Sequence, residues 1–159
     1  MSKTLIIGLG NPIMGDDAVG CKCIDMIKAE GLAAEGVEVD SFFRGGISLM
    51  ERIIGYDRVL IIDSFSGSGK SPGTISHLKM DDLPSRTAAS PHDGSLKAAY
   101  EFGQQMGVPL PVQVDIIAVE IEPKYEFSEE LSPPVKASLR QVFELVLDWL
   151  EDNTAGLEK

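Results

Sequence analysis

A short apolar run that ends at closely spaced glycines constrains the fold of this chain more than any other feature. Thr4-Leu5-Ile6-Ile7 is followed at once by Gly8-Leu9-Gly10-Asn11-Pro12. A continuous apolar run is typical of a strand that is buried on both faces, and the glycines and proline after it favour a turn. The pattern therefore predicts a first strand of the kind found in parallel sheets.

Helix and strand patterns alternate along the rest of the chain. Acidic residues and then helically spaced apolar residues follow Gly15, which favours a helix. Residues 73–78 alternate like a half-exposed strand at or near a sheet edge, and a polar loop over residues 80–90 follows them. This alternation of helices and strands predicts βαβ units with right-handed crossovers. The expected strands cover residues 37–42, 58–63, 73–78 and 112–121, and the expected helices cover 47–54, 96–103 and 133–150 as well as the segment after Asp17.

Length and composition set the broad class. The 159 residues, of which 43% are hydrophobic, suit one folded domain, so we expect a single α/β domain over residues 1–152 and a frayed tail over 153–159. The net charge of -11 disfavours nucleic acids and anionic lipid surfaces as partners. No signal peptide or membrane-spanning run is expected, and Cys21 and Cys23 are too close for an ordinary disulfide. These features predict a cytoplasmic protein.

Acidic side chains follow the first and third expected strands. Asp16 and Asp17 come after the first strand, and Asp63 ends the third. In an open parallel sheet, ligands bind beyond the carboxyl ends of the strands where the winding reverses, and a strand order beginning 2-1-3 would bring these loops together. His92 lies in a later loop just before a helix. Asp, Asp and His form a plausible set of ligands for a divalent transition metal.

Ordinary structural roles compete with this interpretation. Asp16 and Asp17 stand at a helix start, where carboxylates commonly cap free N–H groups, and capping is also open for Asp63. The glycines at 8, 10 and 15 do not have the dinucleotide-binding spacing. Residues 67–71 end like a phosphate-binding loop but lack its upstream glycine, which favours a solvated loop.

The ordered motifs resemble the hydrogenase maturation endopeptidases. The resemblance rests on Gly8 to Gly20, Ile61-Ile62-Asp63, Ser90-Pro91-His92 and Leu131-Ser132-Pro133, which together span most of the chain. It implies a three-layer α/β/α domain, phosphorylase/hydrolase-like, with a five-stranded mixed and mostly parallel sheet. It also implies a peptidase that removes the C-terminal extension of a [NiFe] hydrogenase large-subunit precursor after nickel insertion.

The same resemblance assigns roles to three residues. Asp17, Asp63 and His92 would form the catalytic and metal-binding set, with nickel held by the substrate precursor and Zn or Cd as surrogates. Asp17 stands where other members have Glu, and Ala18 replaces a frequent glycine. Because the sequence offers no recognisable nucleophile arrangement, metal-assisted attack by water is the expected mechanism.

Two other functions remain open from the sequence. Peptidyl-tRNA hydrolases share the Gly-Leu-Gly-Asn-Pro run, but this chain has Asp16-Asp17-Ala18 where that family has an Arg-His-Asn element, and its negative charge opposes tRNA. A non-catalytic, nickel-dependent hydrogenase chaperone is the second alternative. Only cleavage of a precursor separates these possibilities.

Overall fold

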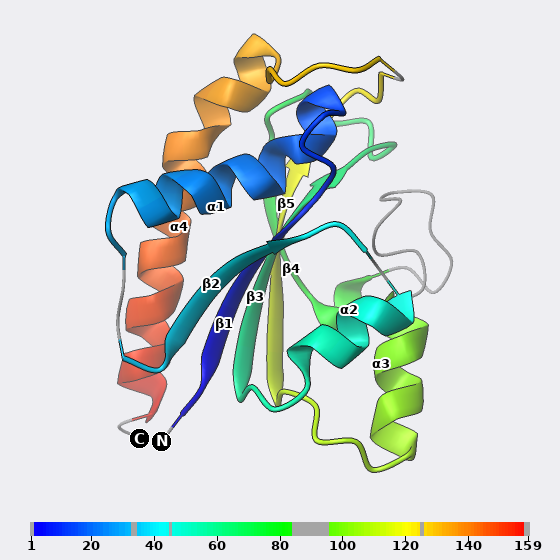
Figure 1. Cartoon of the computed structure of the whole chain (residues 1–159), viewed down its shortest axis with the longest axis vertical. Coiled ribbons are helices and arrows are strands. Elements are labelled where there is room, and N and C mark those ends of the chain that lie inside the picture. Colours follow the sequence, from blue (N-terminus) through cyan, green and yellow to red (C-terminus); the bar gives the residue numbers. More distant parts are fainter. Residues whose placement is uncertain (1, 33–34, 45, 84–95, 125, 158–159) are drawn as a thin grey trace.

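The computed structural model describes residues 2–32, 35–44, 46–83, 96–124 and 126–157, with side chains described up to residue 151. Helices cover both faces of a central sheet (Figure 1). The strands are β1 (Thr4–Leu9), β2 (Val37–Phe42), β3 (Arg58–Phe65), β4 (Ile75–Lys79) and β5 (Gln113–Glu120). The helices are α1 (Val19–Ala29), α2 (Gly46–Ile53), α3 (Leu96–Gln105) and α4 (Pro133–Leu157), with short 3-10 turns η1 (Gly15–Ala18) and η2 (Met80–Asp82).

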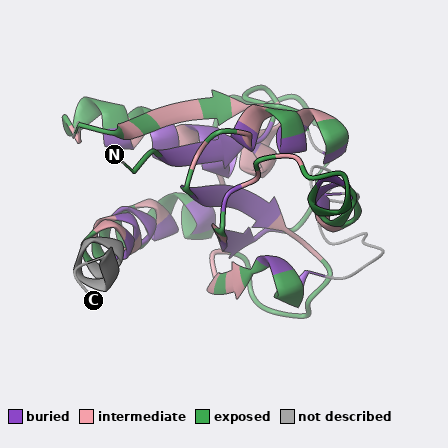
Figure 2. Ribbon diagram, turned by 90° about the horizontal axis from the view of Figure 1, so that it is seen from below, coloured by how far each residue is buried: buried purple, intermediate pink, exposed green. Residues whose placement is uncertain are grey.

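The sheet has the order β2-β1-β3-β5-β4, and β4 alone runs antiparallel to its neighbour within the described chain. The expected five-stranded, mostly parallel sheet is therefore confirmed. Its order begins 2-1-3, which is the condition under which the loops after β1 and β3 lie side by side. Central strands β1, β3 and β5 are almost wholly buried, whereas the edge strands β2 and β4 are partly exposed (Figure 2). The continuous apolar run that predicted β1 thus reflects cover on both faces.

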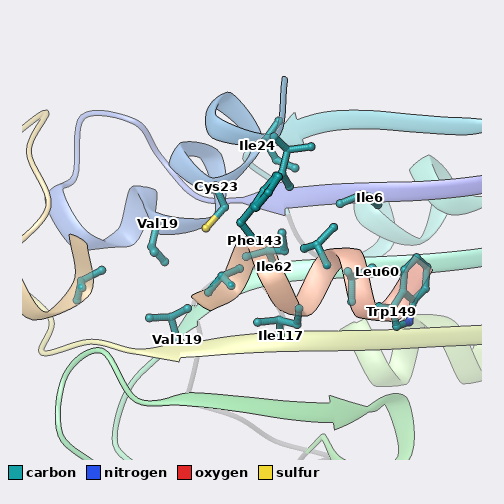
Figure 3. Close-up of a cluster of buried hydrophobic side chains, with 14 of the residues drawn as sticks. Ile6, Val19, Cys23, Ile24, Leu60, Ile62, Ile117, Val119, Phe143 and Trp149 are labelled. Atoms are coloured by element: carbon teal, nitrogen blue, oxygen red, sulfur yellow. The ribbon is translucent and has the colours of Figure 1, made fainter. Parts of the chain in front are cut away.

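Two apolar clusters fill the spaces between the layers. Helices α1 and α4 pack on one face, where Phe143 and Trp149 of α4 lie with Leu60 and Ile62 of β3 (Figure 3). Helices α2 and α3 pack on the other face, with buried residues such as Leu49 in contact with the alternate side chains of β1 and β3. The alternation of side chains along each strand divides them between the two clusters.

A buried carboxylate ties α4 to the sheet at the end of the molecule where the parallel strands begin. Asp115 accepts hydrogen bonds from Trp149 Nε1 and Gln113 Nε2, each at 2.8 Å, and Lys79 Nζ donates at 3.0 Å. His77 Nε2 lies 3.1 Å from the same carboxylate. The His77 side chain is 54% exposed, although its ring nitrogen has this protein partner.

Several element ends differ from the sequence expectations. Strand β3 continues past Asp63 to Phe65, because Ser64 and Phe65 still pair with β5 after β1 has ended. Helix α4 begins at Pro133 as expected but continues past Asp152 to Leu157. Fraying of residues 153–159 and the limits of the domain stay predictions.

Candidate active site

The site lies at the carboxyl edge, the edge of the sheet at which β1, β3 and β5 end. There β1 leaves the sheet after Leu9, whereas β3 continues to Phe65. From β1 the chain passes through η1 and α1 to β2, which lies beside β1 at one edge of the sheet. Strand β3 lies on the other side of β1, and β5 lies beyond it in the opposite direction. This arrangement is the reversal of winding at which open α/β sheets bind their ligands.

Glycines allow η1 and α1 to approach the end of β1 closely. A Cβ atom at Gly20 would lie 2.4 Å from both Ile62 O and Leu9 O, and one at Gly8 would lie 2.2 Å from Gly20 O. Gly10 has φ of 143°, and a Cβ there would lie 2.0 Å from Asp17 O. The glycine motif therefore fixes where η1, and with it Asp17, meets the sheet.

Asp17 and Asp63, called the carboxylate pair below, meet at one residue, Ser64. Ser64 Oγ donates to Asp17 Oδ1 at 3.3 Å, and the Ser64 backbone N–H donates to Asp63 Oδ1 at 2.8 Å. Successive residues of a strand point to opposite faces, so Asp63 shares the α2 and α3 face with Ile61 while Ser64 shares the α1 and α4 face with Ile62. The two carboxylates therefore approach this edge from opposite layers.

The two members of the pair differ in exposure and in the hydrogen bonds that hold them. Asp63 is 1% exposed, whereas Asp17 is half-buried and also accepts a hydrogen bond from the Asn11 backbone N–H at 2.9 Å. Hydrogen bonds from fixed backbone donors hold a carboxylate in one orientation. The arrangement presents fixed negative charge at the edge where a ligand would bind.

Asp16 has a structural contact instead. Ser132 donates to the Asp16 carboxylate through its backbone N–H at 2.7 Å and through its Oγ at 2.6 Å. These bonds connect η1 to the start of α4. The competing role, capping of the following helix by Asp16 or Asp17, is not observed among the described residues, where the N-cap of α1 is Ala18 and has no side-chain hydrogen bond.

His92, the third predicted site residue, lies outside the described residues. Within the part of the chain that the structure describes, no group of three or more His, Cys, Asp or Glu side chains is placed to hold a metal ion. The structure thus brings together two of the three predicted residues. Metal binding by the full set stays a prediction.

Cys21 borders the site but is not an activated nucleophile. Its thiol is buried and donates to Gly10 O at 3.2 Å. Burial raises the pKa of the Cys21 thiol to about 11, and the negative charges of Asp25, Asp17 and Asp63 add to this. The thiol is therefore protonated at neutral pH, whereas nucleophilic cysteines need a lowered pKa.

Glu120 is a further buried carboxylate at the carboxyl edge that the sequence analysis did not single out. It is 6% exposed, lies on the same face of the sheet as Asp63, and accepts a hydrogen bond from Ser68 Oγ at 2.6 Å. The Glu120 backbone also bonds Gly73 and Thr74, each at 2.8 Å. Glu120 thus holds the loop between β3 and β4. Its position at the end of a buried strand, like that of Asp63, is the signal that could have found it.

Comparison with known proteins identifies the class. The model of the hydrogenase maturation protease family matches residues 21–149, a stretch that begins after the Gly8 to Gly20 motif. Hydrogenase 2 maturation protease of Escherichia coli is 24% identical over 156 residues, which are 95% of this chain and 92% of that protein. Protein FrxA of Pyrococcus furiosus is 30% identical over 149 residues, covering 87% of this chain and 98% of that protein.

Solved structures agree in fold. The hydrogenase maturating endopeptidase HYBD from E. coli superposes with a TM-score of 0.82 at 24% identity, covering 95% of this chain and 93% of that one. A hydrogenase 2 maturation peptidase from a Thaumarchaeota archaeon gives 0.67 at 26% identity, covering 94% and 98%. This chain belongs to the hydrogenase maturation protease family, a family of peptidases. The match favours this class over peptidyl-tRNA hydrolase.

Proposed function

We propose that this chain removes the C-terminal extension from a [NiFe] hydrogenase large-subunit precursor once nickel has been inserted. The observation that carries the proposal is the convergence of Asp17 and Asp63 on Ser64 at the reversal point of the sheet. Family membership supplies the reaction, peptide hydrolysis during hydrogenase maturation. The carboxylate pair supplies a place where a cation in the substrate can be recognised.

Nickel enters this proposal as part of the substrate. Carboxylate oxygens at one edge suit a divalent cation, and an imidazole from His92 would add a donor suited to Ni or Zn. Two carboxylates compensate the charge of such an ion, and Zn or Cd is the expected surrogate in the isolated protein.

The residues of the chain have separable tasks in this mechanism. Ser64 and the Asn11 backbone orient Asp17, and burial keeps Asp63 in one position. A divalent cation at this edge would polarise the scissile carbonyl or acidify a water molecule. Fixed charges that are already oriented need no reorganisation during the reaction. The raised pKa of Cys21 supports a route without a thiolate nucleophile.

Cleavage of a purified precursor tests the proposal. Nickel-loaded precursor incubated with the protein should lose the mass of its C-terminal extension, and Asp17→Asn, Asp63→Asn and His92→Ala should each abolish that loss. Asp25→Asn, an exposed carboxylate on α1, is the matched control and should cleave normally. Binding of the precursor by the wild-type protein without any mass loss would favour the chaperone alternative.

The cytoplasmic location expected from the sequence also stays a prediction. Among the described residues, no helix has the length and apolar character needed to cross a membrane. Fractionation of cells that express the untagged chain would test the location, with the protein expected beside its precursor in the cytoplasm.

A further inference from the structure

The large apolar side chains that are exposed among the described residues fall into two groups. One group lies in segments at the carboxyl edge, after β1, after β2 and before α4. The other lies on α3, just after it, or in the segment that enters β5. The first group is Ile13, Phe43, Ile47 and Phe127, and the second is Phe102, Met106 and Val112.

Two members of the first group are held side by side by backbone hydrogen bonds. Gly15 N donates to Ser128 O and Ser128 N donates to Ile13 O, each at 2.8 Å, and Met14 pairs with Ser128 in a parallel bridge. This register places Ile13 next to Phe127. The two side chains, 46% and 82% exposed, form what we call the Ile13–Phe127 patch.

The patch is continuous with the candidate active site. Its first segment runs from Ile13 directly into η1, where Asp17 bonds Ser64. Its second segment runs from Phe127 to Ser132, which holds Asp16 through two hydrogen bonds. The same contacts that fix η1 therefore fix the patch beside the carboxylate pair.

We propose that the Ile13–Phe127 patch is a docking surface for the folded body of the hydrogenase large-subunit precursor, an inference that rests on the proposed function. A rigid, exposed aromatic side chain next to an aliphatic one is typical of the apolar centre of a protein interface. The carboxylate pair would recognise the cation, and the patch would recognise the protein that carries it. The precursor fits better than a second copy of this chain, because the patch borders the site that the scissile segment must reach.

Kinetics with nickel-loaded precursor test this inference in the full chain. Phe127→Ser and Ile13→Ser should each raise KM for the precursor by about tenfold or more while kcat stays near the wild-type value. Their melting temperatures should not change, because both side chains are exposed. Phe102→Ser is the matched control, since Phe102 is 57% exposed on α3, and it should leave KM unchanged.

The possible outcomes are distinct. An unchanged KM in both patch variants, or an equal increase in Phe102→Ser, would overturn the inference. If the wild-type protein binds the precursor but does not cut it, the proposed cleavage is wrong. The docking surface is then tested separately by the dissociation constants for the precursor, which should rise in Phe127→Ser and Ile13→Ser but not in Phe102→Ser. A wild-type dimer in sedimentation that Phe127→Ser converts to a monomer would assign the patch to a second copy and overturn the inference.

Discussion

Two adjacent carboxylates, Asp16 and Asp17, have different tasks although they share one short turn. Asp16 is bonded twice to Ser132, far along the chain, and so connects η1 to α4. Asp17 is bonded to Ser64 and to the Asn11 backbone at the carboxyl edge. One position therefore serves stability, and the next serves the site.

Substitution of each carboxylate should separate these tasks. We expect Asp16→Asn to lower the free energy of unfolding by about 1–2 kcal/mol, because it weakens charge-assisted hydrogen bonds, and to retain binding of nickel. Asp17→Asn should instead weaken nickel binding at least about tenfold with a smaller effect on stability. Denaturant unfolding and titration calorimetry measure the two effects, and identical results for both variants would contradict the division.

The positions of Asp16, Asp17 and Asp63 at the carboxyl edge could be predicted from the sequence, because ligands bind at the carboxyl ends of parallel strands. The family resemblance singled out Asp17 and Asp63, and their role in the site stays a prediction. The separate role of Asp16 could not be predicted, because its partner Ser132 is distant in sequence and both carboxylates have the same local pattern. Glu120 was missed because its contact with Ser68 depends on how the loop after β3 returns to the sheet.

At the scale of elements, the contact between β1 and the start of α1 sets the geometry of the site. Gly8, Gly10 and Gly20 permit backbone approaches that a Cβ atom would block. Because η1 lies between these two elements, any shift of α1 away from the sheet would carry Asp17 away from Ser64. Close packing at this contact thus supports the chemistry.

Gly10→Ala tests this contact. The new Cβ would lie 2.0 Å from Asp17 O, so we expect a loss of about 2 kcal/mol or more in stability together with a large loss of cleavage. Gly31→Ala is the control, because Gly31 also has positive φ but has no heavy atom within 4 Å of the added Cβ. It should lose about 1 kcal/mol through backbone strain alone and cleave normally. Equal effects of the two changes would show that close approach at Gly10 is unimportant.

The sequence predicted the order and type of the elements better than their ends. Val37–Phe42 matches the expected second strand, because its flanks carry turn signals that act locally. The extension of β3 to Phe65 depends on pairing with β5, which is distant in sequence. Local pattern cannot report such a contact, and this is also why the meeting of Asp63 with Asp17 through Ser64 needed the structure.

For the whole molecule, the Asp115 cluster couples β4, β5 and α4 and makes stability depend on pH. Burial alone would raise the pKa of Asp115, but hydrogen bonds from Trp149, Gln113, Lys79 and His77 outweigh it and hold the pKa below its usual range. The folded state therefore releases this proton more readily than the unfolded chain does. The stabilisation is complete above the unfolded-state pKa of about 4 and is lost as pH falls through the folded-state pKa.

Asp115→Asn should reveal this linkage. We expect the variant to lose about 2 kcal/mol or more of stability at pH 7, and the difference from wild type to shrink as pH falls below about 4. Urea unfolding at a series of pH values gives both quantities. Asp148→Asn, an exposed position on α4, should follow the wild-type curve. A difference that stays constant from neutral to acidic pH would contradict a titrating role for Asp115.

We propose that cleavage waits for nickel because the precursor brings the cation that the carboxylate pair recognises. Mass spectrometry after incubation under one condition with nickel-loaded precursor, metal-free precursor and the isolated extension peptide tests it most directly. Only the nickel-loaded precursor should lose its extension, since the chain supplies fixed negative charge but no activated thiolate at Cys21. Equal cleavage of all three substrates would contradict the claim and would make this chain an ordinary peptidase.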